Sequence, residues 1–240
     1  MLLFYVRHGD PIYEPDSLTP LGQAQAQAMK KRLGVHGLDK IYCSSSNRAI
    51  LTAKPTADLL KIEPEIFDWA NAGHAWNQLT VINAENKRHW CYIEPEYVRL
   101  FATPEIRSLG RKWYEHPKFE NTTFGEGICR VQKHADEFLA SLGYVHDHEK
   151  NGYFAQKHNN ERVAFFAHEG FGFAFLSCIM DIPYPEFSTR FQFNHSGLTI
   201  IEFAEPYEDG FVIPHILQHS SDAHIFAEGL PLKYQNRIYL

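Results

Sequence analysis

The sequence predicts an α/β fold with a mostly parallel central sheet flanked by helices, and three observations support this. Residues 2–6 and 163–167 are uninterrupted apolar runs, which is typical of parallel strands buried on both faces. Over residues 1–60, such runs alternate with helical patterns in the order strand, helix, strand, helix. The chain has 240 residues, of which 44% are hydrophobic, so it can bury the core of one large domain.

The first four elements each have a local cause in the sequence. Residues 2–6 form a strand, and a helix over 20–33 follows, with Thr19 as its N-cap and Pro20 at its first position. Residues 40–43 form a second short strand. Residues 48–60 have the composition of a helix, in which a proline marks a kink or an early turn.

Residues 69–125 differ from the rest of the chain. They contain all four tryptophans, their charges are scattered, and their helical periodicity is weak. We therefore expect helices and loops inserted over the sheet as a lid, within a single domain that spans residues 1–240. We also expect the polar segment 144–161 to be an exposed excursion. The remaining predicted elements are helices over 128–142 and 170–180 and strands over 162–167, 198–203 and 211–217, the last an edge strand interrupted by a proline.

Composition excludes several classes of protein. The net charge of −6 argues against non-specific nucleic-acid binding, which needs clustered positive charge. The initial apolar run is too short for a signal peptide, and no segment approaches the ~20 apolar residues of a membrane span. The four cysteines lie far apart without a C-x-x-C pair, which favours reduced thiols and a cytoplasmic protein. The 14 histidines raise the question of which of them do chemistry.

Polar clusters follow three of the predicted strands. Open α/β sheets bind ligands beyond the carboxyl ends of their strands, so we expect these clusters to meet at one crevice. The guanidinium group of arginine matches the oxygens of a phosphate, and the first N–H groups of a helix can donate hydrogen bonds to an anion. A glycine without a Cβ lets the backbone approach such a ligand closely. A neutral histidine beside a bound phosphate is a candidate nucleophile. The clusters are Arg7-His8-Gly9, the segment from Ser44 to Arg48, and His168-Glu169-Gly170.

In these motifs the chain resembles the histidine phosphatase superfamily, the phosphoglycerate-mutase-like fold. The resemblance covers most of the chain and implies a three-layer sandwich. The similar elements, in order, are residues 4–10 with their R-H-G signature, the L-T-x-x-G-x-x-Q-A pattern at 18–26, the S-x-x-x-R-A-x-x-T-A pattern at 44–53, the glycine-rich turn at 125–127, the strand and histidine at 165–170, and Asn194-His195-Ser196.

The resemblance implies roles for these residues. His8 would attack phosphorus and become a phosphohistidine, while Arg7, Arg48 and His168 would hold the phosphoryl oxygens. Gly9 and Ser44 are the expected substrate-binding positions. The partner would be a small phosphorylated metabolite, and no cofactor is expected.

The sequence departs from the family pattern at the position of the general acid. The mutase-like branch carries a glutamate a few residues before a glycine, and this chain has Asp68 offset by one, with Trp69 in the expected place. Glu169 is the rival, since the acid-phosphatase branch carries its acid beside the second histidine. A nearby phosphate would raise the pKa of either carboxyl group and keep it protonated. Further alternatives are the carboxylates Glu85, Glu94 and Glu96 in the inserted segment.

The favoured activity is a phosphomonoesterase, and alternatives stay open. A phosphoglycerate mutase would need a longer insert than the short loop over residues 10–17, and a non-catalytic phosphate-binding member of the fold is a third reading. A homodimer is compatible with the aromatic residues of the insert. His215, His219 and His224, and the pair His146-x-His148, are candidate metal ligands, but no carboxylate spacing completes a known site, so no metal is expected.

Overall fold

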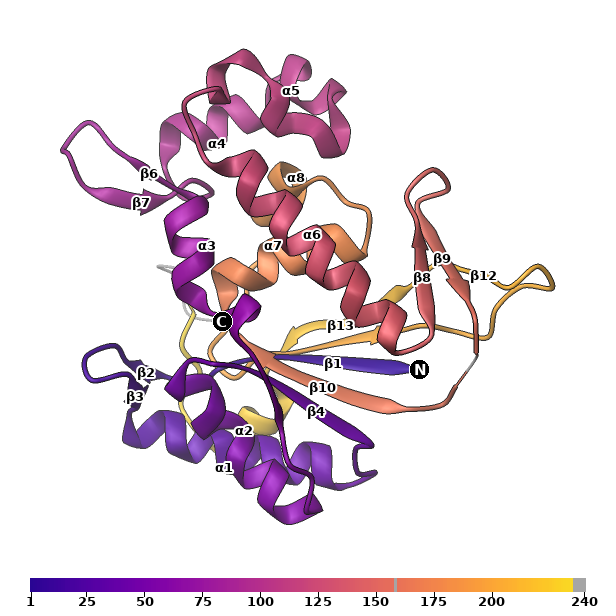
Figure 1. The fold of residues 1–240 in the computed structure, drawn as a ribbon. Coiled ribbons are helices and arrows are strands. Elements are labelled where there is room, and N and C mark those ends of the chain that lie inside the picture. Colours follow the sequence, from indigo (N-terminus) through magenta and orange to yellow (C-terminus); the bar gives the residue numbers. More distant parts are fainter. Residues whose placement is uncertain (158, 235–240) are drawn as a thin grey trace.

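The structure, a computed structural model, describes residues 1–157 and 159–234 and is organised around a six-stranded sheet (Figure 1). The strand order is β13-β11-β1-β10-β4-β5. Neighbours from β1 to β5 pair in parallel, whereas β11 runs antiparallel to both β1 and β13. The predicted α/β class with a mostly parallel sheet is thereby confirmed. The strands of this sheet are β1 (Leu2–Arg7), β4 (Lys40–Ser44), β5 (Glu65–Phe67), β10 (Arg162–Ala167), β11 (Leu198–Glu202) and β13 (His215–Ser221).

Helices cover both faces of the sheet, so the molecule has three layers (Figure 1). Alternate side chains of β1 point to opposite faces. Leu3 and Tyr5 share a hydrophobic cluster with α6 (Phe124–Ser141) and α7 (Glu169–Ile179). Phe4 and Val6 share a second cluster with α1 (Pro20–Gly34) and α2 (Asn47–Leu60). Within the described ranges, no helix combines the length and the apolar character needed to cross a membrane.

Most of the inserted segment packs against α6, α7 and α8 (Tyr184–Ser188) (Figure 1). Its start touches the sheet, where Trp69 meets Phe165 of β10 edge to face. The inserted segment is not purely helical, because it contains a small antiparallel hairpin of β6 and β7. Its buried Phe101, Trp113 and Phe119 belong to the same hydrophobic cluster as β1 and α7. Its elements are α3 (Ala72–Gln78), β6 (Thr80–Ile82), β7 (Arg88–Trp90), α4 (Pro95–Phe101), α5 (Pro104–Ser108) and three short 3-10 helices at Asp68–Ala70, Gly110–Glu115 and Pro117–Phe119.

Two expectations from the sequence were wrong in part. Residues 144–161 are not simply an exposed excursion, because β8 (Tyr144–Asp147) and β9 (Gly152–Ala155) form a hairpin in which Tyr144 and Tyr153 are buried. The expected strand over 211–217 is interrupted at Pro214 and ends at a sheet edge, as predicted, but its two parts are separate strands in different sheets. Phe211 and Val212 form β12, which pairs with β9, whereas β13 begins at His215 and pairs with β11. Pro214 lies between them, where its missing N–H interrupts the ladder.

Two further small elements complete the described part of the chain. A short hairpin of β2 (Pro11–Ile12) and β3 (Ser17–Leu18) follows the first strand, and α9 (Ala223–Ala227) lies beside α1.

The turn after β1 packs very closely against the first turn of α1. Thr19 caps that helix, as predicted, by accepting a hydrogen bond from the Gly22 N–H at 3.0 Å. The Thr19 N–H in turn donates to the Asp10 carbonyl at 3.0 Å. A Cβ at Gly22 would lie 2.2 Å from that same carbonyl oxygen, and a Cβ at Gly9 would lie 2.7 Å from the Gly22 oxygen. The two glycines therefore fix the distance between the helix start and the residue that follows β1.

We predict that Gly22→Ala destabilises the protein although alanine favours helices. The new methyl group would overlap backbone rather than a movable side chain, and overpacking of this kind costs about 1–3 kcal/mol of unfolding free energy. Thermal or urea unfolding measures the change. Gly34→Ala is the matched control, because its Cβ would meet only the end of the Leu59 side chain. Equal losses of stability in both variants would contradict the prediction.

Candidate active site

The carboxyl ends of β1, β4 and β10 bring the three predicted clusters together around one cavity of about 410 Å³. Arg7 ends β1, and His8 follows it. Arg48 lies in the first turn of α2, after β4, and His168 and Glu169 follow β10. All five side chains line the cavity. The remaining lining residues are Tyr13, Ala72, Gly73, Trp76, Trp90 and Gly170.

The orientation of His8 is fixed by the backbone. Its Nδ1 lies 2.8 Å from the Gly9 carbonyl oxygen, and because a carbonyl only accepts, Nδ1 is the protonated nitrogen. Burial, with the nearby His168 and Arg7, lowers the pKa of His8 well below its usual range. His8 is therefore neutral, and its Nε2 carries the free lone pair that a nucleophile needs.

His168 is fixed by one hydrogen bond to its backbone carbonyl and one to its imidazole ring. Its carbonyl accepts a hydrogen bond from the Tyr5 hydroxyl at 2.6 Å, and its Nε2 lies 2.8 Å from Ser44 Oγ. The Ser46 N–H donates to the same Ser44 oxygen, so the Ser44 proton is free to point at Nε2. That arrangement puts the ring proton of His168 on Nδ1, which is buried without a protein partner among the described residues. An N–H donor of this kind suits an anionic oxygen.

Arg7 is almost fully buried, and its guanidinium is oriented by three groups. It donates to the Phe193 carbonyl and to His195 Nε2, the latter at 2.8 Å, and it lies 3.3 Å from Glu169 Oε2. Burial, together with Arg7, lowers the pKa of His195 to about 4, so this third histidine is neutral. Its protonated Nδ1 faces Asp10 Oδ1 at 3.4 Å. The Asn194-His195-Ser196 motif thus contributes a residue that positions Arg7.

Arg48 is oriented by the loop that follows β1. Its Nη1 donates to Asp16 Oδ1 at 2.7 Å, and its guanidinium lies 5.5 Å from the centre of the Tyr13 ring. The same carboxylate accepts the Asn47 N–H at 2.8 Å, at the start of α2. Sequence reasoning did not select Asp16 or Tyr13. Their only signal was their place in the short loop between the R-H-G motif and the first helix.

The two candidate acids lie in opposite environments. The Glu169 side chain is 15% exposed, and burial raises its pKa, although Arg7 opposes this. The Asp68 side chain is 78% exposed and does not line the cavity. It accepts hydrogen bonds from His74 and Ser45, which lower its pKa. Among the alternatives Glu85, Glu94 and Glu96, none lines the cavity either.

Gly9 and Ser44 lie beside the cavity without lining it. The Gly9 N–H donates to Thr52 Oγ1 at 3.0 Å, and its missing Cβ makes room for α1 rather than for a ligand. Ser44 contacts His168. Direct binding of substrate by these two residues therefore stays a prediction, whereas their contacts position the neighbouring histidines.

Aromatic side chains form the outer wall of the cavity. The Trp76 and Trp90 rings meet edge to face with their centres 5.0 Å apart, and both come from the inserted segment. A Cβ at Gly170 would lie 2.4 Å from Trp90, so the glycine lets the indole pack against the start of α7. The inserted segment thus covers the candidate catalytic residues with apolar surface, which is compatible with the predicted lid.

The histidines weighed as metal ligands at the end of the chain do not meet. His224 is buried and bonds Ser196 Oγ at 3.0 Å, while the His219 ring faces the Gln192 carbonyl at 2.8 Å. His215 is exposed on β13. In the described residues, the group of side chains with metal-binding spacing lies elsewhere, at His146 and His148.

Comparisons with known proteins agree with the motifs and with the fold. Residues 3–90 match the family model of the histidine phosphatase superfamily (branch 1), which confirms the resemblance. A phosphoserine phosphatase from Entamoeba histolytica is a similar solved structure, with a TM-score of 0.56 and 18% identity, covering 93% of this chain and 98% of its own. A mycobacterial glucosyl-3-phosphoglycerate phosphatase has a TM-score of 0.58 at 15% identity, covering 92% of this chain and 99% of its own. No curated protein sequence matches the chain.

We predict that Ser44→Ala disturbs the ring of His168. Without the hydroxyl, the buried Nε2 loses its partner, which should cost about 1–3 kcal/mol of unfolding free energy and release the preference for the Nδ1–H tautomer. Nitrogen chemical shifts of the histidine rings report the tautomer, and urea unfolding reports the stability. Ser45→Ala is the control, since this hydroxyl bonds the exposed Asp68 instead. An unchanged His168 spectrum in Ser44→Ala would rule out the assignment.

Proposed function

From the match of residues 3–90 to the histidine phosphatase superfamily, we propose that this protein is a phosphatase that hydrolyses a small phosphomonoester through a phosphohistidine on His8. The observation that carries the proposal is the neutral His8 ring, with its proton held on Nδ1 by Gly9, at a cavity that also contains two arginines. Phosphoryl transfer needs mostly positioning and charge stabilisation, and these residues provide both.

In the first step, Nε2 of His8 forms a bond to phosphorus while the bond from phosphorus to the ester oxygen breaks. Arg7 and Arg48 balance the charge on the phosphoryl oxygens, and the Nδ1–H of His168 donates to one of them. Buried Nε atoms of both arginines have no protein partner among the described residues, so each guanidinium keeps a donor available. In the second step, water attacks the phosphohistidine, inorganic phosphate leaves, and His8 regains its lone pair.

We assign the proton donor to Glu169. It lines the cavity beside Arg7, and burial raises its pKa, so it can carry a proton to the leaving oxygen and take one from the attacking water later. Asp68 is the second candidate. It would have to move toward the cavity and give up its bonds to Ser45 and His74.

The cavity favours a small substrate with a ring or an apolar body. Its volume of about 410 Å³ lies near the lower end of ligand pockets, which span roughly 300–1,000 Å³. Trp76, Trp90 and Tyr13 offer flat apolar surface. Two of the similar solved structures are a phosphoserine phosphatase and a glucosyl-3-phosphoglycerate phosphatase, whose names point to small phosphomonoesters. The free thiols of all four cysteines support the cytoplasm as the proposed compartment.

We predict that the wild-type protein hydrolyses p-nitrophenyl phosphate or members of a phosphometabolite panel, and that His8→Ala reduces the rate to background. Phosphate release measures the activity, and acid-labile, base-stable labelling of the protein with ³²P measures the phosphohistidine. His36→Ala, a change at an exposed histidine, should keep full activity. If the wild type and His8→Ala give the same rates over the whole panel, the proposal fails.

Glu169→Gln and Asp68→Asn separate the two candidate acids. If Glu169 donates the proton, Glu169→Gln should slow an alkyl phosphate by about 10²–10⁴-fold and p-nitrophenyl phosphate much less, because nitrophenolate leaves without a proton. Asp68→Asn should affect both substrates equally and weakly. The raised pKa of Glu169 also predicts that kcat for the alkyl phosphate falls as pH rises through that pKa, and that this limb is missing in Glu169→Gln. The reverse pattern between the variants would assign the role to Asp68.

A further inference from the structure

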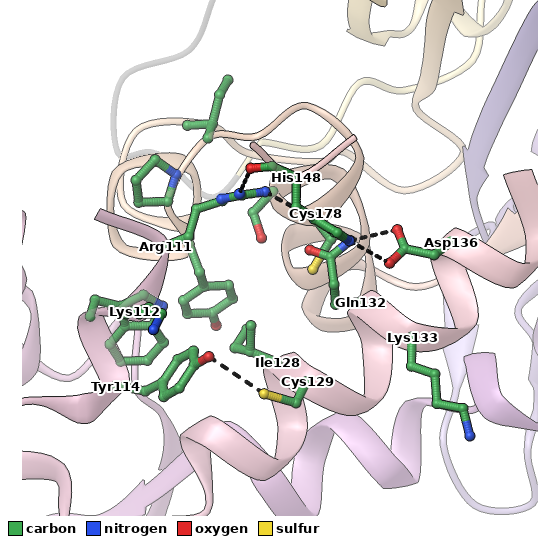
Figure 2. A pocket seen from close by; sticks show the side chains of 15 residues that line it. Arg111, Lys112, Tyr114, Ile128, Cys129, Gln132, Lys133, Asp136, His148 and Cys178 are labelled. Atoms are coloured by element: carbon green, nitrogen blue, oxygen red, sulfur yellow. Dashed lines mark hydrogen bonds and ion pairs between the residues drawn. The ribbon is translucent and has the colours of Figure 1, made fainter. Parts of the chain in front are cut away.

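A second group of chemistry-bearing side chains lies beside a cavity at the C-terminal end of α7, whereas the candidate active site lies at the N-terminal end of that helix. Asp136 comes from α6, His146 from β8, and His148 follows β8 directly. Asp136 and His148 line a cavity of about 440 Å³ between α6, α7 and the inserted segment (Figure 2). No residue lines both this cavity and the candidate active site.

The three side chains already have the spacing of ligands around one ion. His146 Nδ1 lies 2.8 Å from Asp136 Oδ1, and His148 Nε2 lies 2.9 Å from Asp136 Oδ2. One donor atom from each residue lies within 4.8 Å of the others. Two donors that are each ~2.1 Å from a tetrahedral zinc ion are ~3.4 Å apart, so small side-chain rotations would suffice. Residues 146 and 148 share one face of the strand because side chains alternate along it.

Outer contacts orient these side chains in the way that metal sites require. The other nitrogen of His146, Nε2, donates to Asp181 Oδ2 at 3.0 Å, which leaves Nδ1 as the nitrogen that can ligate. A carboxylate bound to the far side of a ligating imidazole is a common feature of zinc sites. Gln132 Nε2 donates to Asp136 Oδ1 at 2.8 Å, and Arg111 donates to Asp181. The His146 side chain is only 1% exposed, so its contacts are shielded from water, whereas the His148 side chain is 46% exposed.

We propose that Asp136, His146 and His148 bind one divalent transition-metal ion, such as Zn²⁺, with an open coordination position toward the second cavity. Two imidazoles and one carboxylate favour zinc-like ions over Mg²⁺ and Ca²⁺, which prefer oxygen ligands alone. Both His146 Nδ1 and His148 Nε2 face Asp136 as N–H donors, so both must lose that proton to ligate the ion: the proton of His146 Nδ1 is released to solvent, and that of His148 Nε2 is replaced by one on His148 Nδ1. The ion would connect α6 to the β8–β9 hairpin and would stabilise the folded protein.

Arg111 limits the affinity of this site. Its Nη1 lies 3.3 Å from His148 Nδ1, and its Nη2 donates to the His148 carbonyl at 2.7 Å. An imidazole that ligates through Nε2 carries its proton on Nδ1, so the first of these contacts must loosen when the ion binds. The positive charge of the guanidinium also opposes the cation. Both effects predict a weaker site than a closed structural zinc centre.

Titration of the metal-free, full-length protein with Zn²⁺ tests the proposal by calorimetry and thermal unfolding. We expect one equivalent to bind and the melting temperature to rise. His148→Ala changes a half-exposed side chain, so the protein should fold, and it should weaken binding by at least about tenfold, since even outer contacts of a metal ligand are worth 10–100-fold. Asp136→Asn should weaken binding as well.

His134→Ala is the control, because this histidine lies on the same helix but outside the group. It should bind Zn²⁺ as the wild type does. Co²⁺ gives a second readout, since its absorption bands report nitrogen and oxygen ligands and should vanish in His148→Ala. Equal binding by the wild type and His148→Ala would show surface binding by other histidines and would overturn the proposal, as would less than one equivalent bound by the wild type. None of these measurements depends on phosphatase activity.

Discussion

The candidate site depends on the burial of the Arg7 guanidinium at the end of the central strand. A buried charge is costly unless it is paired and hydrogen-bonded, and here the partners come from distant parts of the chain. Glu169 follows β10, while the Phe193 carbonyl and His195 precede β11. The hydrogen bonds and the ion pair of the Arg7 guanidinium therefore hold the ends of three neighbouring strands, β10, β1 and β11, in one arrangement.

The same buried positive charge determines the protonation of its neighbours. Burial and the arginines keep His8, His168 and His195 neutral, while burial in the same cavity raises the pKa of Glu169. Each neutral ring then needs a defined tautomer, and the Gly9 carbonyl, Ser44 and the Arg7 guanidinium provide it. A cavity with free cationic donors and neutral histidines is arranged for an anion that arrives from solvent.

Sequence patterns predicted the sheet, the helices on either side and the residues at the strand ends, because each depends on local features. Apolar runs mark β1 and β10, and Thr19 with Pro20 marks the start of α1. The β8–β9 hairpin was missed because the apolar stretches around Tyr144 and Tyr153 are very short, and the two tyrosines are buried only by long-range packing. The interruption at Pro214 was predicted, but the placement of β12 and β13 in different sheets was not, because strand partners are set by long-range contacts.

The sequence by itself determined which chemistry is present: two histidines and two arginines at strand ends, in an order typical of one superfamily. Only the tertiary structure decided which nitrogen of each histidine is free, that Glu169 and not Asp68 faces the cavity, and that Asp136 completes the His146-x-His148 pair. The physical reason is that burial and hydrogen-bond partners are long-range properties. Asp136 and His146 are adjacent because α6 packs along the β8–β9 hairpin, and no spacing in the sequence encodes that contact.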